Sequence, residues 1–276
     1  MPTCYFPRLI RNPNYSFLTA PDDGQLSLMM VPCGKCYACL SARRRQWLFR
    51  LKQESLHSKF TFFITLTYND ENNNNHLRKE DLHNFLRRIR RDHGVKYYSI
   101  GEYGTRTKRP HYHIILFVKD SESSLSEETR RYNWIYYIRS KWNLGNVVVS
   151  EANVKRLNYI CHYHTRPKRI ELPDGTLGET FCLMSKGIGL QFMTPENLEI
   201  IKTRKKKDVF DLEGQTITLP RYYRKKFDIE PPEPMYDTKS LLQQAEEFHM
   251  DPFNYLMDMR DKDTKKMTKY DNQEKL

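Results

Sequence analysis

Runs of β-branched and aromatic residues alternate along the middle of the chain with stretches in which apolar residues recur every three or four positions. The first pattern is typical of buried strands and the second of amphipathic helices. Together they predict strands over residues 60–68, 96–103, 111–118 and 146–151, and helices over residues 41–58, 78–93, 126–142 and 153–164. This order, with a hairpin turn at residues 104–110, predicts an α+β fold: a mainly antiparallel sheet with helices packed on one side of it.

The two ends of the chain have weaker patterns. Five prolines interrupt the first 32 residues, which we expect to form an irregular N-terminal arm. Beyond residue 165 the sequence predicts a turn at 173–178, a glycine-bearing loop at 185–192 and a short strand at 217–219. The segment Pro231–Pro234 predicts a stiff linker, followed by one helix over residues 240–248 and a charged end that we expect to be disordered.

These patterns divide the chain into four parts. An N-terminal arm with a cysteine-rich turn and a basic helix precedes the core, which is followed by a basic extension packed on the core and by a linker with a charged C-terminal tail. The expected boundaries are 1–58, 59–170, 171–230 and 231–276.

Composition bounds the class of protein. Hydrophobic residues make up only 38% of the 276 residues, but 18 tyrosines and 14 phenylalanines supply apolar surface for a core. No uncharged stretch approaches the roughly 18 residues needed to cross a bilayer, and residues 1–17 lack the layout of a signal sequence. We therefore expect neither a membrane span nor a classical secretory route.

Net charge indicates the class of partner. The chain has 46 Lys and Arg against 34 Asp and Glu, a formal charge of +12. The 7 basic and 10 acidic residues from Pro231 onward leave +15 on residues 1–230. Nucleic acid is a natural partner, because each phosphate that is neutralised releases counterions. The predicted helix at 41–58 either follows DNA or is simply solvated along its basic face, which consists of Arg43, Arg44, Arg45, Arg50 and Lys52.

Three of the six cysteines, Cys33, Cys36 and Cys39, fall in the seven-residue run CGKCYAC. This spacing is too tight for a disulfide framework and is closer to that of metal ligands, so it favours a reducing compartment. The run could hold a structural Zn²⁺ with Cys4 or a histidine as the fourth ligand. Three thiols packed at the start of a helix are the alternative.

Two histidines, His111 and His113, open the predicted strand at 111–118. Side chains alternate between the two faces of a strand, so both imidazoles lie on one face. If the hairpin is centred near Thr107, Glu102 lies roughly opposite them and completes a three-ligand site with open positions, which suits Mn, Fe, Zn or Mg. Taken alone, such a pair is more often two surface histidines.

Tyr159 and Tyr163 are four residues apart, so a helix there would present both phenols on one face. Such a pair usually packs in a core, but this one precedes the basic residues Arg166, Lys168 and Arg169. A phenol has a pKa near 10 and needs a nearby cation or base to ionise. A metal that polarises a phosphate and a tyrosine that attacks it would together nick and rejoin a DNA strand.

The ordered motifs FTFFITLTY, YYSIGEYG, RPHYHIILF and YICHY resemble those of the HUH endonuclease superfamily of rolling-circle replication initiators. The surrounding VPCGKCYACLSARRRQWLFRL and SKGIG resemble, more narrowly, the replication initiation proteins of gokushovirus-like Microviridae, which are small single-stranded DNA bacteriophages. The resemblance covers roughly residues 33–192 and implies an HUH/RRM-like nuclease core.

The resemblance implies an HUH-type endonuclease that nicks and joins DNA. His111 and His113 would be paired ligands of Mg²⁺ or Mn²⁺, with Glu102 as the third ligand. Tyr159 and Tyr163 would be nucleophiles that join covalently to a DNA 5′-phosphate and leave a free 3′-hydroxyl.

Two positions depart from the pattern of the phage relatives. His162 stands before the second tyrosine, where relatives often carry a lysine or arginine, and Arg166 stands three residues after it, where they carry a lysine. The sequence therefore leaves two candidates, Arg166 and Lys168, for the cation that would lower the phenol pKa.

The implied partners are single-stranded origin DNA and host replication proteins in the bacterial cytoplasm. We expect DNA contacts from Arg106, Lys108 and Arg109 in the hairpin turn and from Lys168, although a solvated turn is the equal alternative. Two other functions fit the sequence. A non-enzymatic single-stranded DNA-binding or packaging protein needs only charge and aromatic residues, and a hydrolytic metallonuclease would use water in place of the tyrosines.

Overall fold

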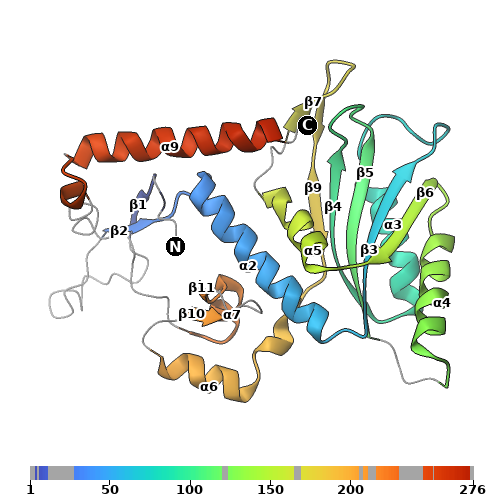
Figure 1. Ribbon diagram of the computed structural model, residues 1–276. Coiled ribbons are helices and arrows are strands. Elements are labelled where there is room, and N and C mark those ends of the chain that lie inside the picture. Colours follow the sequence, from blue (N-terminus) through green and yellow to red (C-terminus); the bar gives the residue numbers. More distant parts are fainter. Residues whose placement is uncertain are drawn as a thin grey trace.

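The computed structural model describes residues 4, 6–11, 28–119, 124–164, 169–204, 208–210, 216–229, 245–250 and 252–273. Its centre is a five-stranded antiparallel sheet in the order β6-β3-β5-β4-β9 (Figure 1). The strands are β3 (Phe60–Tyr68), β4 (Val95–Tyr103), β5 (Pro110–Val118), β6 (Gly145–Glu151) and β9 (Phe181–Met184). The predicted α+β fold and its antiparallel sheet are confirmed, and β9 is a fifth strand that the sequence pattern did not predict.

Helices cover both faces of this sheet, so the prediction of helices on one side is wrong. In β5, Tyr112 and Ile114 pack on one side, whereas Ile115 and Phe117 pack on the other. A strand that is apolar on both faces needs cover on both faces. The first side is covered by α3 (Lys79–Asp92) and α4 (Glu127–Ser140), and the second by α2 (Tyr37–Leu56) and α5 (Val154–Cys161) (Figure 1).

The loop at residues 185–192 is fixed on α2 by a buried carboxylate. Glu54, which is fully buried, accepts hydrogen bonds from Nζ of Lys96 at 2.9 Å and from the backbone N–H of Gly189 at 2.7 Å. Gly189 has a φ of +73°, and a Cβ there would lie 2.6 Å from the carbonyl oxygen of Arg50. A glycine is therefore required at this close approach.

Smaller elements surround α2 and the sheet. β1 pairs with β2 where an irregular arm was predicted, and β11 overlaps the predicted short strand at 217–219. Phe49 of α2 packs in a separate apolar cluster with Leu219 and Tyr223. The remaining pairs and helices are β1 (Arg8–Arg11) with β2 (Leu28–Val31), β7 (Arg169–Glu171) with β8 (Leu177–Glu179), β10 (Asp208–Phe210) with β11 (Thr216–Thr218), η2 (Leu190–Phe192), α6 (Pro195–Thr203) and α7 (Arg221–Lys226).

The charged C-terminal segment forms a helix, α9 (Pro252–Gln273), so the prediction of a disordered end is wrong (Figure 1). Its buried Asp263 accepts a hydrogen bond from the backbone N–H of Tyr37 at 3.2 Å. Tyr37 is the first residue of α2, where N–H groups lack partners within the helix and a carboxylate is favourable. This contact and the buried Tyr255 hold α9 in place.

Other predictions for the C-terminal part lie outside the described residues. These are the linker at 231–234 and residues 240–244, which form most of the last predicted helix. Among the described helices, none is both long enough and apolar enough to cross a membrane.

Candidate active site

Polar side chains gather on the α5 side of the sheet, at the end of β4 and β5 where the hairpin turn joins them. Glu102 and His111 are direct partners in the register of β4 and β5, and His113 lies two residues further along β5 on the same face. All three line a pocket of about 280 Å³ together with Tyr159 and Tyr163. The structure therefore brings together the five residues that the sequence singled out for chemistry.

Each histidine is oriented by a threonine on β3. Oγ1 of Thr65 lies 3.0 Å from Nδ1 of His113, and Oγ1 of Thr67 lies 3.3 Å from Nδ1 of His111. On the other side of its ring, Nε2 of His113 is 3.1 Å from Oε1 of Glu102. Neither threonine was predicted as part of the site, although the alternation in FTFFITLTY already places them on one face of β3.

Burial, and then the neighbouring His113, lowers the pKa of His111. Desolvation disfavours the charged imidazolium, and a second imidazole nearby acts in the same direction. The neutral form is the one that binds metal ions. His111 is therefore held in the protonation state that a metal ligand requires.

Tyr159 reaches the carboxylate from α5. Its hydroxyl donates a hydrogen bond to Oε1 of Glu102 at 2.7 Å, and its ring lies edge-on to His113 with the ring centres 5.4 Å apart. The side chain is 37% exposed, so solvent reaches it. The preceding residue, Asn158, accepts a 2.7 Å hydrogen bond from Arg44, which ties α5 to α2.

Tyr163 has a different environment. α5 ends at Cys161, and Tyr163 lies in a 3₁₀ turn, η1 (His162–His164), so the prediction of one continuous helix through both tyrosines is wrong. Its side chain is only 9% exposed, and burial raises its pKa. The two phenols therefore line one pocket with unequal access to solvent.

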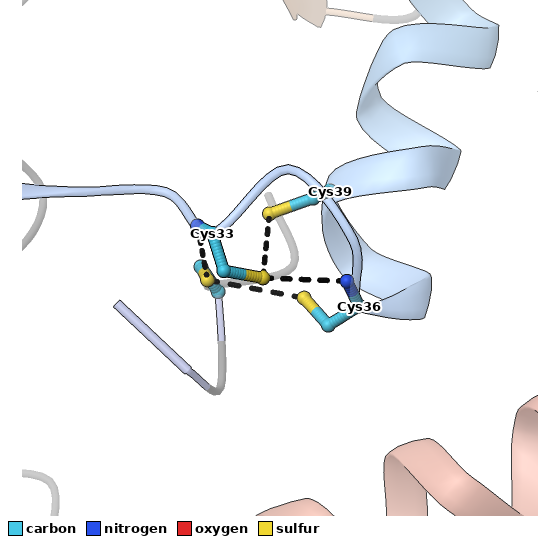
Figure 2. A group of neighbouring side chains, drawn as sticks. Cys33, Cys36 and Cys39 are labelled. Atoms are coloured by element: carbon cyan, nitrogen blue, oxygen red, sulfur yellow. Dashed lines mark hydrogen bonds between the residues drawn. The ribbon is translucent and has the colours of Figure 1, made fainter. Parts of the chain in front are cut away.

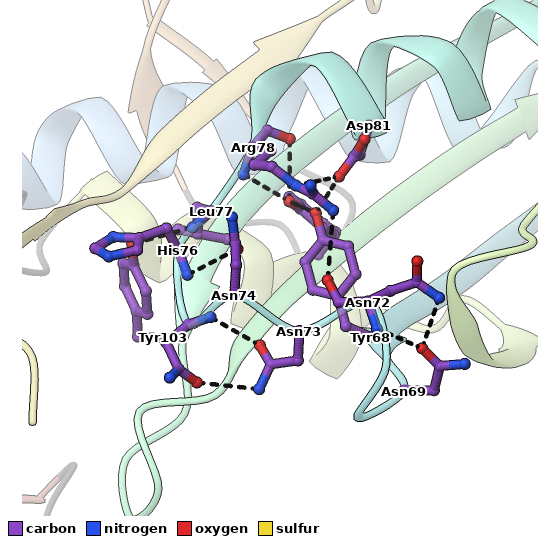
Figure 3. A network of polar contacts seen from close by, with 12 residues as sticks. Tyr68, Asn69, Asn72, Asn73, Asn74, His76, Leu77, Arg78, Asp81 and Tyr103 are labelled. Carbon is purple, nitrogen blue, oxygen red and sulfur yellow. Dashed lines mark hydrogen bonds and ion pairs between the residues drawn. The ribbon is translucent and has the colours of Figure 1, made fainter.

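Tyr103 and Gly104 form one wall of the pocket. A Cβ at Gly104 would lie 3.1 Å from Nε2 of His111, so the glycine keeps that nitrogen accessible. The hydroxyl of Tyr103 accepts a 3.1 Å hydrogen bond from the backbone N–H of Leu77, at the end of the asparagine-rich loop shown in Figure 3. The ring of Tyr103 also packs against Gly178, where a Cβ would lie 2.7 Å from it. This wall was not predicted, because its contacts come from distant segments.

The basic residues of the hairpin turn have different surroundings. Arg106 is exposed, and Lys108 is half-buried with a φ of +53°. Arg109 turns inward, and its Nη2 donates a 2.8 Å hydrogen bond to Asp70. Arg109 therefore already has an ion-pair partner within the protein.

Two further cations that the sequence suggested, Arg166 and Lys168, lie outside the described residues. Arg169 begins β7 and pairs with Glu179 across the β7–β8 hairpin, with Nε 2.8 Å from Oε1.

The donor set at the hairpin end fits a divalent cation. Glu102, His111 and His113 offer a carboxylate and two imidazoles, which Mn²⁺ and related ions accept. The two imidazole ring centres are 6.5 Å apart, so the donors are not drawn tightly together. Within the part of the chain that the structure describes, only a separate cysteine group has all its candidate ligand atoms within 4.8 Å of one another.

This cysteine group lies at the start of α2 and consists of the predicted Cys33, Cys36 and Cys39 with Cys4 as its fourth member (Figure 2). The sulfurs of Cys33 and Cys39 are 3.9 Å apart, and those of Cys36 and Cys4 are 3.8 Å apart. Four Zn–S bonds of about 2.3 Å in a tetrahedron place the sulfurs about 3.8 Å from one another. Partial burial raises the pKa of Cys33, but hydrogen bonds from the backbone N–H groups of Lys35 and Cys36 outweigh burial and lower it to about 7. The group could therefore hold a metal ion.

The sequence is similar to phage replication proteins. A family profile described as "Replication-associated protein ORF2/G2P" matches residues 61–168, the segment that carries Glu102, both histidines and both tyrosines of the site. The chain is 28% identical over 223 residues to replication-associated protein ORF2 of Spiroplasma virus 4, an alignment that covers 72% of this chain and 68% of that protein.

Two other phage proteins are similar over less of their own length. Replication-associated protein VP4 of Bdellovibrio phage phiMH2K is 28% identical over 154 residues, which cover 50% of this chain and 49% of that protein. Replication-associated protein ORF4 of Chlamydia phage 1 is 25% identical over 213 residues, which cover 70% of this chain and 52% of that protein. These matches confirm the resemblance to phage replication proteins that the motifs indicated. Among solved structures, the hypothetical protein ORF119 from Sulfolobus islandicus rod-shaped virus 1 aligns with 42% of this chain and 88% of its own, at 14% identity and a TM-score of 0.27.

Proposed function

We propose that this chain initiates rolling-circle replication of a phage genome by nicking single-stranded origin DNA with a tyrosine. The observation that carries the proposal is the hydrogen bond from the Tyr159 hydroxyl to Glu102, beside His113, in a pocket that solvent reaches. Similarity to the replication-associated proteins of three phages supports the biological setting.

Tyr159 is the nucleophile in this proposal. Its oxygen attacks the scissile phosphorus and displaces the 3′ oxygen of the preceding nucleotide, so a phosphodiester to the protein replaces one in the DNA. The phenol must lose its proton in this step, and Glu102 already accepts its hydrogen bond and is placed to take the proton. The released 3′ oxygen becomes a hydroxyl that a polymerase can extend. Attack by a 3′-hydroxyl on the phosphotyrosine reverses the step and rejoins the strand.

Glu102, His111 and His113 would hold Mg²⁺ or Mn²⁺. The bound cation would supply positive charge to the scissile phosphate. The chain's own contribution is to present neutral imidazoles and a carboxylate at the pocket, with Thr65 and Thr67 holding the two rings in orientation.

Tyr163 serves the second strand transfer. Its smaller exposure supports first attack by Tyr159, whose exposed fraction is fourfold larger, 37% against 9%. Because both phenols line one pocket, the second can receive a strand while the first remains joined to DNA. This order of events gives one nick and one rejoining in each replication cycle.

The substrate would be origin DNA of the phage, in the cytoplasm of its bacterial host, where host replication proteins would extend the 3′ end. Arg106 and Lys108 stand beside the pocket in the hairpin turn and would contact the DNA backbone, as would Lys168. Each such cation adds affinity that does not depend on sequence.

The four cysteines would hold a structural Zn²⁺. Cys4 comes from the N-terminal segment, whereas Cys33, Cys36 and Cys39 surround the start of α2. A bound ion would therefore join two segments that also meet in the β1–β2 pair and in one small apolar cluster. Four thiolate ligands leave no open position, so the role would be structural.

Covalent capture tests the proposed function. The protein would be incubated with labelled single-stranded phage origin DNA and Mn²⁺, and the products separated on a denaturing gel. We expect a protein–DNA adduct that requires the metal and is absent from the variant with both Tyr159→Phe and Tyr163→Phe. Cleavage without an adduct would instead indicate a water-based nuclease, and binding with neither would indicate a DNA-binding protein.

A further inference from the structure

A second, larger pocket lies away from the tyrosines, among α2, α5 and α9. Its volume is about 550 Å³, within the range of ligand-binding pockets. Side chains from all three helices line it, and cations dominate: Arg44, Arg45, Lys52, Lys155 and Lys266, with Ser41 beside them.

No carboxylate is among the described residues that line this pocket. Burial, and then the neighbouring Arg44, lowers the pKa of Arg45, because desolvation and like charge both disfavour a second guanidinium charge there. An arginine nevertheless stays protonated in proteins. The described lining thus carries five cationic side chains and no carboxylate.

Two hydrogen-bonding atoms of the lining are unsatisfied. Within the described part of the chain, Nη2 of Arg45 and Oγ of Ser41 are buried and have no hydrogen-bond partner. Leaving a buried polar atom without a partner is unfavourable. An anionic ligand with several acceptor oxygens would accept hydrogen bonds from Arg45 and Ser41, and its negative charge would be attracted by the cationic lining.

The pocket adjoins the helix that carries the nucleophile. Lys155 and Asn158, which line the pocket, belong to α5, and Lys155 is four residues before Tyr159. Residues four apart on a helix are neighbours on its surface, with Cβ atoms about 6 Å apart. A strand that leaves the phenol along α5 therefore meets Lys155 first and then the other cations.

We propose that this basic pocket binds the phosphodiester backbone of the single-stranded DNA next to the scissile phosphate. The inference rests on the proposed nicking function, and it assigns to the pocket the part of the strand that is held while Tyr159 attacks. A phosphate backbone matches the lining because it carries one negative charge and acceptor oxygens at each nucleotide. Three residues of the predicted basic face of α2, Arg44, Arg45 and Lys52, would then form this side of the DNA path.

The test uses two exposed lysines from opposite sides of the pocket, Lys155 on α5 and Lys266 on α9. The full-length variant with Lys155→Gln and Lys266→Gln would be compared with wild type and with Arg139→Gln, an exposed cation on α4 across the sheet. Binding of a fluorescein-labelled oligothymidylate would be measured by fluorescence anisotropy in EDTA. The salt concentration would be varied about fourfold, from about 50 to about 200 mM.

We expect the double variant to bind roughly tenfold more weakly and its plot of log K against log salt to lose about 1.4 of its slope, since each single-strand phosphate contact contributes about 0.7. Arg139→Gln should match wild type. Affinity and slope equal to wild type in the double variant would overturn the proposal. So would a loss of ATP binding, measured in parallel, without any loss of oligothymidylate binding, because it would assign the pocket to a free nucleotide.

This experiment separates the pocket from the chemistry. Binding in EDTA involves no cleavage. If wild type forms no covalent adduct but the double lysine variant binds DNA more weakly than wild type, the nicking function is refuted and the DNA-binding role of the pocket is supported. If wild type forms an adduct and the double variant binds DNA as tightly as wild type, the nicking function is supported and the DNA-binding role of the pocket is refuted.

Discussion

The hydroxyl of Tyr159 lies 2.7 Å from Oε1 of Glu102, although 57 positions separate the two residues in the chain. The carboxylate comes from the β4–β5 hairpin and the phenol from α5, which packs on the same face of the sheet. This contact places a proton acceptor at the hydroxyl that we propose as the nucleophile.

The two tyrosines should differ in their effect on the first nick. Tyr159→Phe should reduce formation of the covalent adduct by roughly 10³-fold or more, because removal of a nucleophile removes the covalent pathway. Tyr163→Phe should retain the first nick and lose the later strand transfer, since the proposed order gives the buried phenol the second step. Single-turnover cleavage and a joining assay measure the two steps. Equal losses of the first nick in both variants would contradict the order of attack.

The threonine beside His113 should tune metal binding. Thr65→Val removes the hydroxyl 3.0 Å from Nδ1 of His113 and should weaken Mn²⁺ binding by roughly 10- to 100-fold, the usual effect of losing a hydrogen bond to a metal ligand. Thr61→Val is the matched control on β3, because Thr61 contacts Ser55 instead. Isothermal titration with Mn²⁺ gives the comparison, and equal affinities in the two variants would count against a metal site at the histidines.

The cysteine group should contain about one equivalent of zinc. We expect a chelator to release it from the purified protein and to lower the unfolding temperature, because binding energy at a structural site contributes directly to folding. Cys4→Ser should reduce zinc content and unfolding temperature in the same direction, whereas Cys182→Ser, outside the group, should leave the zinc content unchanged. Protein purified without detectable zinc after expression in zinc-containing medium would contradict this assignment.

The buried Glu54 should make its lysine partner important for stability. Lys96→Met leaves a fully buried carboxylate without the ammonium 2.9 Å away, and we expect a loss of about 3 kcal/mol in the free energy of unfolding. Lys59→Met breaks the exposed pair with Glu127 and should have a much smaller effect, because solvent screens this pair. Urea unfolding would compare the two. A smaller effect of Lys96→Met than of Lys59→Met would show that the N–H donors of Gly189 and Gln191 satisfy Glu54 without the lysine.

Local patterns predicted the hairpin part of the site well. Alternation in a strand and a short turn suffice to place Glu102 opposite His111, as the register confirms. The threonines on β3 follow from the same alternation once β3 and β5 are known to pair. These relationships depend on sequence neighbours or on a single hairpin, so they can be predicted from the sequence alone.

Long-range packing explains what the sequence did not predict. The second layer of helices, the strand β9 and the helix α9 are stabilised by contacts between segments far apart in the chain, such as Asp263 with Tyr37. Helical periodicity continued through Tyr163, but the chain turns into η1 after Cys161, and that change has no clear local signal. Cys4 joins its cysteine partners across 29 to 35 positions, so only the folded chain distinguishes it from a histidine as the fourth member of the group.

The most direct test of the account is to identify the residue that carries DNA. The protein would be trapped on single-stranded origin DNA with Mn²⁺, digested with nuclease and protease, and its peptides examined by mass spectrometry. We expect a nucleotide 5′-phosphate on Tyr159 in wild type, and on neither tyrosine when EDTA is present. Efficient cleavage with no nucleotide on any peptide, unchanged when both tyrosines are replaced by phenylalanine, would contradict it.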